Sequence, residues 1–457
     1  MEFLDRVDER KRLERFLRQP EGAMACLYGR RRIGKSRLLE AVLAGRADVA
    51  AYCADRSEAA LQRARMAEDF SFVVQGFSDS VYRDWRRFFE RWQRDAPRGS
   101  VMVIDEFPYL VEKSPELPSV LQKIADGLRR SGQKIVICGS SQRMMQGLVL
   151  DEREPLYGRC RVIMKLEPIG YDWLRKAFPK LSAFGRFEHY AVWGGVPRYW
   201  DVCQGEESLW TTLRDEVFSR QGLFHNEPAF VLQDDLEGAA QASSVLSLIG
   251  QGVGRPSEMA ARLQVPQTAL GRPLKRLLEL GLARREIPFR ADAKGGKRAH
   301  YKIEDPFLRF WYTFVLPRYS DGAFLSRKED LVRIKEPFRA FLGEAWERLV
   351  RDALPTHSLP GIASKWKSVG CWWGQGMNGR PMEIDVVAES ADGRNLLVGE
   401  AKLKLSRREY EHELAELRVK AELLPFARDY EKVIVKMFVA EGGDFDCVDL
   451  RWCGQPN

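Results

Sequence analysis

Short apolar runs alternate with amphipathic stretches over the first 170 residues of the chain. The runs AMACLY at 23–28, VMVI at 101–104 and KIVICGSS at 134–141 each lead into glycine, acidic or small polar residues, and an amphipathic stretch at 37–44 follows the first. Apolar runs of this length, separated by helical patterns, are typical of buried parallel strands. The pattern therefore predicts an α/β fold whose ligand lies at the carboxyl ends of a parallel sheet.

The middle of the chain changes to a helical and aromatic pattern. From 171 to about 235 this pattern is broken only at WGGVPRYW, 193–200, and the helical stretches SSVLSLIG, RPSEMAARL and 267–280 follow. Two strand-like stretches, ARREIPFR and KRAHYKIE, then flank Lys294-Gly295-Gly296. This order predicts a winged helix with a hairpin wing. Pro273 lies inside the third helical stretch and predicts a kink there.

The last third of the chain predicts a second α/β region. The aromatic segment 301–315 is expected to form core. An amphipathic helix at 341–354 then precedes the strand-like run SKWKSVGCWWGQG and the hairpin EIDVVAESADGRNLLVGEAK at 383–402. LRVKAELL gives a further helix and KVIVKMFVA a buried strand. The predicted order is helix, three strands, helix, strand.

Composition narrows the class of protein only a little. The 457 residues carry a net charge of +8 with a pI near 9.0, which suits nucleic acid or an ordinary solvated basic surface equally well. The N-terminus MEFLDRVDERKR is charged from its second residue, unlike a signal peptide, and no apolar run is long enough to span a membrane. The eight cysteines form no CxxC pair. A cytoplasmic protein with no membrane partner is predicted.

A glycine-rich motif follows the first apolar run. It has the form Gly-x-x-x-x-Gly-Lys-Ser, and the predicted phosphate-binding residues are Gly29, Arg30, Arg31, Arg32, Ile33, Gly34, Lys35, Ser36 and Arg37. Glycines allow backbone N–H groups to surround a phosphate at a helix N-terminus, the lysine reaches the β- and γ-phosphates, and the serine hydroxyl can bind Mg²⁺. The alternative is an unrelated Gly-Lys turn. A second motif argues against that alternative.

The second motif is a pair of acids at the end of the run 101–104. Asp105 is expected to hold Mg²⁺, and Glu106 is expected to polarise an attacking water. Ser140 and Ser141 follow a further strand and are either contacts to the γ-phosphate or water, or simply a polar strand end. Together the motifs predict ATP and Mg²⁺ as ligands.

These segments resemble the archaeal-type ATPase family, a STAND branch of AAA-like P-loop ATPases. The resemblance rests on FLDRVDERKRLERFL, YGRRRIGKS, the Asp-Glu strand end, CGSS and EPLYGRCRVIMKLEPIG. It implies that Arg6 lies near the adenine and that Ser140 and Ser141 occupy the sensor-1 position. It also implies that Arg159 senses phosphate or acts between subunits of a homo-oligomer, and that Pro197 of a helical lid lies close to the base.

The hairpin at 383–402 carries acids where strand interiors are usually apolar. Asp385 is followed fifteen residues later by Glu400-x-Lys402, and Glu347 lies on the preceding helix. This arrangement resembles the PD-(D/E)xK nuclease core, with Ile384 in place of the motif's proline. The resemblance implies that Asp385, Glu400 and Glu347 bind Mg²⁺ or Mn²⁺ and that Lys402 holds water or phosphate. The alternative is an ion pair between Asp385 and Lys402 across the hairpin.

The predicted winged helix has two possible uses. Its third helix and wing are basic, through Arg272, Lys275, Arg276, Arg284, Arg285, Arg290, Lys294, Lys297 and Arg298. Such residues can contact DNA, whereas winged helices of STAND proteins often serve as intramolecular hinges.

These patterns divide the chain into five predicted regions. They are a P-loop ATPase core (1–170), a helical lid (171–238), a winged helix (239–305), a connecting segment (306–340) and a nuclease-like domain (341–457). The predicted function is an ATP-hydrolysing switch coupled to a nuclease-like domain that acts on DNA. The alternatives are a regulatory ATPase whose last domain binds DNA or protein without cleaving, and an assembly module that binds nucleotide without hydrolysis.

Overall fold

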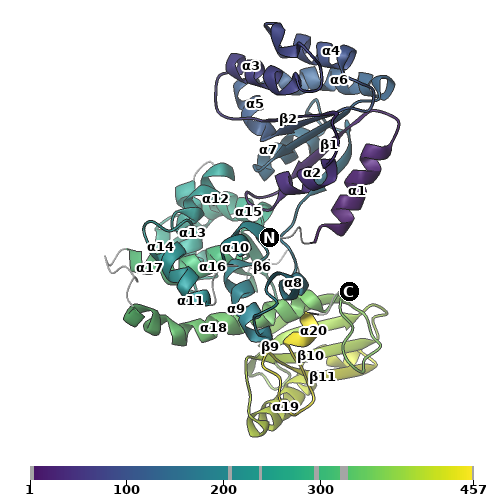
Figure 1. The fold of residues 1–457 in the computed structure, drawn as a ribbon. Coiled ribbons are helices and arrows are strands. Elements are labelled where there is room, and N and C mark those ends of the chain that lie inside the picture. Colours follow the sequence, from purple (N-terminus) through teal and green to yellow (C-terminus); the bar gives the residue numbers. More distant parts are fainter. Residues whose placement is uncertain (1–4, 204–207, 236–238, 293–297, 320–327, 455–457) are drawn as a thin grey trace. The chain divides into compact units, whose positions relative to one another are not determined.

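The computed structural model describes residues 5–203, 208–235, 239–292, 298–319 and 328–454 (Figure 1). The chain divides into two compact units. The first comprises Met1–Pro168, Val196–Arg198 and Phe230–Glu237, and the second comprises Ile169–Gly195, Tyr199–Ala229 and Gly238–Asn457. None of the helices described is long and apolar enough to cross a membrane.

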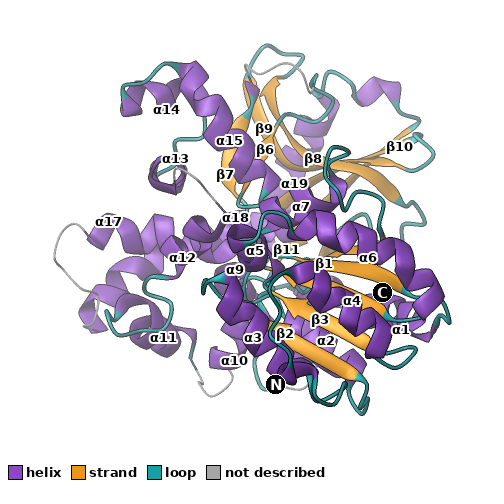
Figure 2. Cartoon of the chain, turned by 90° about the horizontal axis from the view of Figure 1, so that it is seen from above, coloured by secondary structure: helices purple, strands orange, loops and turns teal. Residues whose placement is uncertain are grey.

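The first unit is built around a parallel sheet with strand order β2-β3-β4-β1-β5 (Figure 2). Its strands are β1 (Ala23–Tyr28), β2 (Val49–Cys53), β3 (Val101–Asp105), β4 (Lys134–Gly139) and β5 (Cys160–Lys165). Its helices are α1 (Val7–Arg18), α2 (Lys35–Leu43), α3 (Ala59–Phe70), α4 (Trp85–Asp95), α5 (Phe107–Lys113), α6 (Leu117–Ser131) and α7 (Gln142–Leu150). The predicted α/β fold with a parallel sheet is confirmed.

A single core in the first unit joins the sheet to the helices from α3 to α7. Alternate residues of β1, Met24 and Cys26, enter this core together with the aromatic side chains of α4. The other residues of β1 point to the opposite face, because side chains alternate along a strand. Helix α1 packs against α2 and β5 instead. The loops at the carboxyl ends of β1, β3 and β4 are thereby held on a rigid base.

Helices make up the first part of the second unit, as predicted. They are α8 (Leu174–Ala177), α9 (Ala183–Trp193), α10 (Pro197–Cys203, which starts in the first unit), α11 (Leu209–Thr212) and α12 (Glu227–Asp235, which belongs to the first unit from Phe230 on). Helices α13 (Ala239–Gly250), α14 (Pro256–Leu263) and α15 (Gly271–Glu279) follow, and then the antiparallel strands β6 (Ala283–Glu286) and β7 (His300–Ile303). The predicted turn Lys294-Gly295-Gly296 lies outside the described residues.

The kink predicted at Pro273 does not arise. The stretch predicted as one helix begins with a 3₁₀ turn, Gln267–Leu270, and α15 starts only at Gly271. Pro273 therefore lies in the first turn of α15, where a backbone N–H has no partner within the helix. The proline costs no hydrogen bond at this position.

The rest of the second unit places helices around a second sheet. Its strand order is β12-β11-β10-β9-β8, with β10 and β11 parallel and β8, β9 and β10 antiparallel to one another. The elements are α16 (Pro306–Phe310), a π-helical segment (Trp311–Val315), α17 (Leu316–Tyr319), α18 (Lys328–Ala353), β8 (Trp366–Gln375), β9 (Pro381–Ser390), β10 (Asn395–Lys402), α19 (Arg407–Glu422), β11 (Lys432–Val439), β12 (Cys447–Val448) and α20 (Leu450–Cys453). The predicted order of helix, three strands, helix and strand is confirmed.

Helix α18 is longer than predicted. It begins at Lys328 rather than at 341 and contains Pro337, which the sequence pattern treats as a breaker. The helix continues through the proline because Ile334, Phe338 and Phe341 are all buried on it. The predicted aromatic core of 301–315 is also confirmed, since Phe307, Phe310, Tyr312 and Phe314 are buried.

Candidate nucleotide site and C-terminal acidic cluster

The glycine-rich loop connects β1 to α2. Gly34 precedes the first residue of α2 and has a φ of +95°, a conformation that favours glycine. A β-carbon on Gly29 would lie 2.7 Å from the carbonyl oxygen of Leu166, so this position also excludes a side chain. The loop therefore ends at a helix N-terminus with its backbone exposed to a bound phosphate.

Lys35 is held inside this loop. Its Nζ donates hydrogen bonds to the carbonyl oxygens of Gly29, at 3.0 Å, and Arg30, at 3.3 Å, and its side chain is buried. These acceptors are neutral. The positive charge of Lys35 is therefore available to an anion bound in the loop.

Ser36 and Asp105 meet at the carboxyl ends of β1 and β3. Ser36 Oγ donates to Asp105 Oδ2 at 2.7 Å, and the backbone N–H of Glu106 donates to Asp105 Oδ1 at 2.9 Å. A hydroxyl beside a carboxylate supplies the hard oxygen ligands that Mg²⁺ prefers. This pair fits the predicted magnesium site.

Cys138 is a member of this cluster that sequence reasoning missed. Its Sγ lies 2.6 Å from Asp105 Oδ1 and donates to it. Burial, reinforced by the Asp105 charge, raises the pKa of the Cys138 thiol well above its ordinary value, so the thiol keeps its proton. The signal was available only from strand order: β4 lies next to β3, and Ile104 pairs with Ile137.

Glu106 and Ser140 join the same cluster from β3 and β4. Glu106 has a left-handed backbone, with a φ of +50°, and its Oε2 accepts from the backbone N–H of Ser140 at 3.0 Å and from Ser140 Oγ at 2.8 Å. Ser141 has a different role, because its Oγ caps α7 by accepting from the N–H of Met144. The structure thus separates the two serines that the sequence pattern left together.

Arg6 and Pro197 both lie against the glycine-rich loop. Arg6 is only 4% exposed, and its Nη2 donates to the carbonyl oxygens of Ile33, at 3.3 Å, and Glu167, at 2.6 Å. Its Nη1 pairs with Glu9 at 3.1 Å. A β-carbon on Gly34 would lie 3.8 Å from Pro197 Cγ. Two residues far apart in the sequence therefore flank the loop, and their contacts to a nucleotide base stay predictions.

The remaining predicted residues of the first unit lie at different distances from this cluster. Arg159 pairs with Asp126 of α6 at 2.9 Å, so its sensing or inter-subunit role stays a prediction. Within the loop, Ile33 is buried, Arg30 and Arg32 are half-buried, and Arg31 and Arg37 are exposed.

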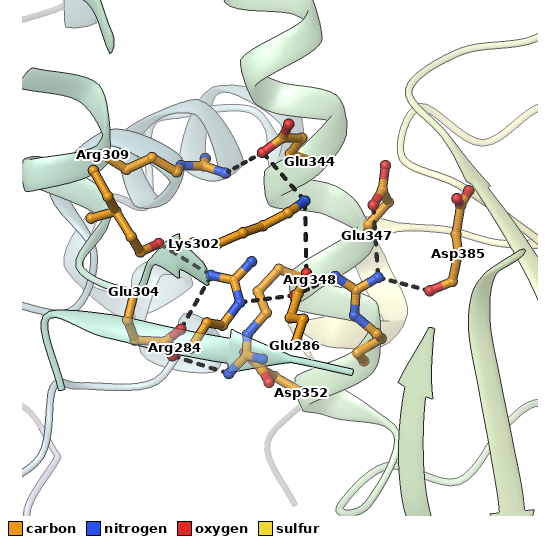
Figure 3. A network of polar contacts seen from close by, with 12 residues as sticks. Arg284, Glu286, Lys302, Glu304, Arg309, Glu344, Glu347, Arg348, Asp352 and Asp385 are labelled. Carbon is orange, nitrogen blue, oxygen red and sulfur yellow. Dashed lines mark hydrogen bonds and ion pairs between the residues drawn. The ribbon is translucent and has the colours of Figure 1, made fainter. Parts of the chain in front are cut away.

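Glu347 and Asp385 form a second acidic site, between α18 and β9 (Figure 3). Burial raises the pKa of Glu347, and the neighbouring Asp385 raises it further. Burial raises the pKa of Asp385 in the same way, with Glu400 adding to the effect. Asp385 Oδ2 accepts from the backbone N–H of Ala401 at 2.9 Å. The two carboxyl groups therefore share a poorly solvated site in which two negative charges are unfavourable.

Glu400 and Lys402 are engaged with other partners. Glu400 is buried, with Oε1 lying 3.2 Å from Lys402 Nζ and Oε2 lying 3.3 Å from Lys420 Nζ. Lys402 also pairs with Glu413 at 3.4 Å. The ion pairs recorded for Lys402 thus run to Glu400 and Glu413, not to Asp385 across the hairpin. Across the described ranges, no group of three or more His, Cys, Asp or Glu side chains is placed to hold a metal ion. The metal-binding roles of Glu347, Asp385 and Glu400 stay predictions.

Strand β6 of the predicted wing is tied to the acidic site through Arg351. This side chain is buried, and its Nη1 donates to the carbonyl oxygen of Asp385 at 2.7 Å and lies 3.7 Å from Glu347 Oε2. Its Nη2 lies 3.5 Å from Glu286 Oε1 on β6. Arg351 therefore joins β6, α18 and β9.

Several basic residues proposed for DNA contact are used inside the protein. Arg284 pairs with Glu286 at 2.9 Å and with Glu304 at 3.2 Å. Arg290 pairs with Asp429 and lies over the rings of Phe426 and Tyr430. Lys294 and Lys297 lie outside the described residues. The described part of the wing is therefore engaged with the rest of the second unit.

Comparisons with known proteins match the chain in two parts. Residues 3–199 match a family model described as an ATPase domain predominantly from Archaea. Residues 311–413 match a model of archaeal and bacterial proteins of unknown function. An uncharacterized protein of Methanocaldococcus jannaschii is 28% identical over 459 residues, which cover 98% of this chain and 99% of that protein.

Solved structures give more distant similarities. The Walker-type ATPase PABY2304 of Pyrococcus abyssi is 20% identical, with a TM-score of 0.49 over 68% of this chain and 96% of that one. The ORC2 protein of Aeropyrum pernix is 14% identical, with a TM-score of 0.46 over 70% of this chain and 95% of that one. The cluster around Lys35 thus lies within the part of the chain that matches the ATPase domains found predominantly in Archaea, and the Glu347 and Asp385 site lies within the part that matches archaeal and bacterial proteins of unknown function.

Proposed function

We propose that the chain binds ATP with Mg²⁺ at the glycine-rich loop and hydrolyses it. The observation that carries this proposal is the meeting of Lys35, Ser36, Asp105, Glu106 and Ser140 at the carboxyl edge of one parallel sheet. Each side chain is of the type that phosphoryl transfer to water needs, and the loop ends at a helix N-terminus.

The roles follow from the position of each group. The Lys35 ammonium attracts the β- and γ-phosphates, which would replace its carbonyl acceptors. Ser36 and Asp105 would hold Mg²⁺, which neutralises phosphate charge when bound. The Glu106 carboxylate orients a water as nucleophile, and Ser140, which donates to Glu106, keeps that carboxylate in position or senses the γ-phosphate. Arg6 and Pro197, against the loop, would border the base.

Two variants test the proposal and separate it from a module that only binds nucleotide. Lys35→Ala is expected to abolish ATP binding, measured by a fluorescent ATP analogue, because the loop loses its buried cation. Glu106→Gln is expected to bind ATP normally but to release phosphate at least about 100-fold more slowly, since the water is no longer activated. Unchanged turnover in both variants would refute the assignment. No turnover in the parent protein would favour the nucleotide-locked module instead.

We further propose that nucleotide state regulates the C-terminal domain through the helical lid and a winged helix, in the manner of STAND ATPases. The proposed regions are those expected from the sequence: 1–170, 171–238, 239–305, 306–340 and 341–457. Support comes from the ion pairs that join β6 and β7 to α18, which favour an intramolecular joint over a free DNA reader. The proposal also includes a role for Arg159 between the subunits of a homo-oligomer. A cytosolic location is proposed as well, which is consistent with the eight free cysteines.

A second candidate function is cleavage of DNA by the C-terminal domain with Mg²⁺ or Mn²⁺. The observation that favours it is the pair Glu347 and Asp385, two half-buried carboxyl groups whose charges interact. The ion pairs of Glu400 with Lys402 and Lys420 favour the alternative, a domain that binds DNA or protein without cleaving, because they engage a carboxylate that a metal would need.

Incubating plasmid, linear and branched DNA with either metal distinguishes the two candidates. A nuclease is expected to cut in a metal-dependent way, and Asp385→Ala is expected to lose at least about 100-fold of that activity. Cleavage that persists in Asp385→Ala would assign it to another site or protein. Retarded but uncut DNA in a gel-shift assay would support binding alone.

A further inference from the structure

The second unit contains a cavity of about 280 Å³. It is bordered by the C-terminal turn of α13 and the glycines that follow, by β7, and by α16 and α18. The apolar part of its wall includes Ile249, Phe314 and Phe341. At roughly 30 Å³ for each water molecule, the space matches a small organic molecule rather than a nucleotide.

Lys302 and Arg309 line this cavity, and both side chains point toward Glu344 of α18 (Figure 3). Lys302 Nζ lies 3.8 Å from Glu344 Oε2 and 3.8 Å from Glu286 Oε2. Arg309 Nη1 lies 3.9 Å from the same oxygen of Glu344. These distances exceed hydrogen-bond length, so one carboxylate is shared loosely between two cations.

Arg309 retains unused hydrogen-bonding capacity. Its guanidinium stacks on the Phe341 ring at 3.9 Å from the centroid, and its Nη2 donates to the carbonyl oxygen of Phe341 at 3.3 Å. A guanidinium has five N–H donors, and among the described residues this is the one hydrogen bond of its side chain. Burial, reinforced by the neighbouring Arg284, lowers the pKa of Arg309 to about 10, and Glu344, Glu347 and Glu304 offset this only in part.

The charge balance of the wall favours an anion. Lys302 and Arg309 are opposed by Glu344 alone among the acidic residues that line the cavity. His300 and Tyr301 are the other titratable groups of the lining, and burial, together with Arg255 and Lys302, lowers the pKa of His300 and favours its neutral ring. Two cations next to apolar walls, one of them half-buried and the other largely buried, are the chemistry that recognises an anionic head group on an apolar body.

We propose that this cavity binds a small organic anion, with its carboxylate or phosphate group between Lys302 and Arg309 and its apolar part against Phe314 and Phe341. The anionic group of the ligand would pair with Lys302 and Arg309 more closely than the Glu344 carboxylate does. It would also connect β7, which carries Lys302, to α18, which carries Glu344 one turn before Glu347. The site would therefore serve as an effector site, and this inference stands independently of ATP hydrolysis.

Calorimetric titration of the full chain tests the proposal. The chain carries Lys35→Ala, so that binding of phosphate groups at the glycine-rich loop does not contribute. Benzoate and phenyl phosphate are the probes, and benzyl alcohol is the neutral control. We expect at least one anion to bind at least tenfold more tightly than the alcohol, and the stronger of the two identifies the preferred head group.

Variants then assign the binding to the cavity. Lys302→Met is expected to weaken the anion at least tenfold, and Glu344→Gln is expected to tighten it, because the competing carboxylate is removed. Lys404→Met, at an exposed lysine of the same unit, is the matched control and should leave affinity unchanged. Three results would overturn the proposal. Benzyl alcohol could bind as tightly as the anions, or neither the Lys35→Ala chain nor its Glu344→Gln form could bind an anion. Lys404→Met could also weaken binding as much as Lys302→Met does.

Discussion

At the scale of single residues, the carboxylate of Asp105 depends on three donors from three segments of the chain. Ser36 and Glu106 were predictable, because each belongs to a motif with fixed spacing. Cys138 was not, because it reaches Asp105 only through the pairing of β3 with β4, and a cysteine in an apolar run reads as ordinary core. Sequence spacing thus predicts contacts within a motif and misses contacts made by strand order.

The thiol of Cys138 gives a prediction at this scale. Cys138→Ala removes one donor from Asp105, so the carboxylate is held less firmly and the concentration of Mg²⁺ that half-saturates ATP hydrolysis is expected to rise about tenfold. Cys138→Ser keeps a donor and is the matched control, with an expected change below about threefold. Titrating Mg²⁺ at saturating ATP measures the effect. An identical Mg²⁺ response in Cys138→Ala and the parent protein would exclude this positioning role.

At the scale of elements, the apolar pattern predicted the strands and helices closely. It did not predict which charged side chains of different elements pair with one another. The helix α18 and the strand β9 were both predicted, and so were Glu347 and Asp385 on them. The ion pair between Arg351 and Glu286 could not be predicted. A sequence does not show whether a charged residue near the predicted hairpin binds phosphate or pairs with another side chain of the protein. Pro273 and Pro337 show the same limit, because burial and helix position decide whether a proline interrupts a helix.

The acidic pair between α18 and β9 makes stability depend on pH. The pKa of Glu347 is raised in the folded protein, so the folded state binds its proton more tightly than the unfolded state does. Stability is therefore highest at low pH and is lost as the pH rises past the ordinary carboxyl range toward the raised pKa. Glu347→Gln is expected to remove about 1–3 kcal/mol of that loss between pH 5 and pH 8, since one pKa unit is worth about 1.4 kcal/mol.

Urea denaturation at the two pH values measures this dependence. Glu336→Gln, at an exposed position of the same helix, is the matched control and should keep the parent's pH profile. If the stability of Glu347→Gln fell as steeply with rising pH as that of the parent, ionisation of Glu347 beside Asp385 would not destabilise the folded protein.

At the scale of the whole molecule, a switch requires that nucleotide change the free energy of the second unit as well as the first. Both units have their own sheet and core, so each is expected to contribute its own thermal transition.

A non-hydrolysable ATP analogue with Mg²⁺ at 100 times its dissociation constant should stabilise the first unit by about 2.7 kcal/mol. Regulation predicts an additional shift of about 1–3 kcal/mol in the transition of the second unit. Differential scanning calorimetry measures both, and Lys35→Ala should show neither. A shift confined to the first unit would leave ATP binding intact but would rule out the regulatory coupling, because a ligand cannot bias a unit whose states it does not distinguish.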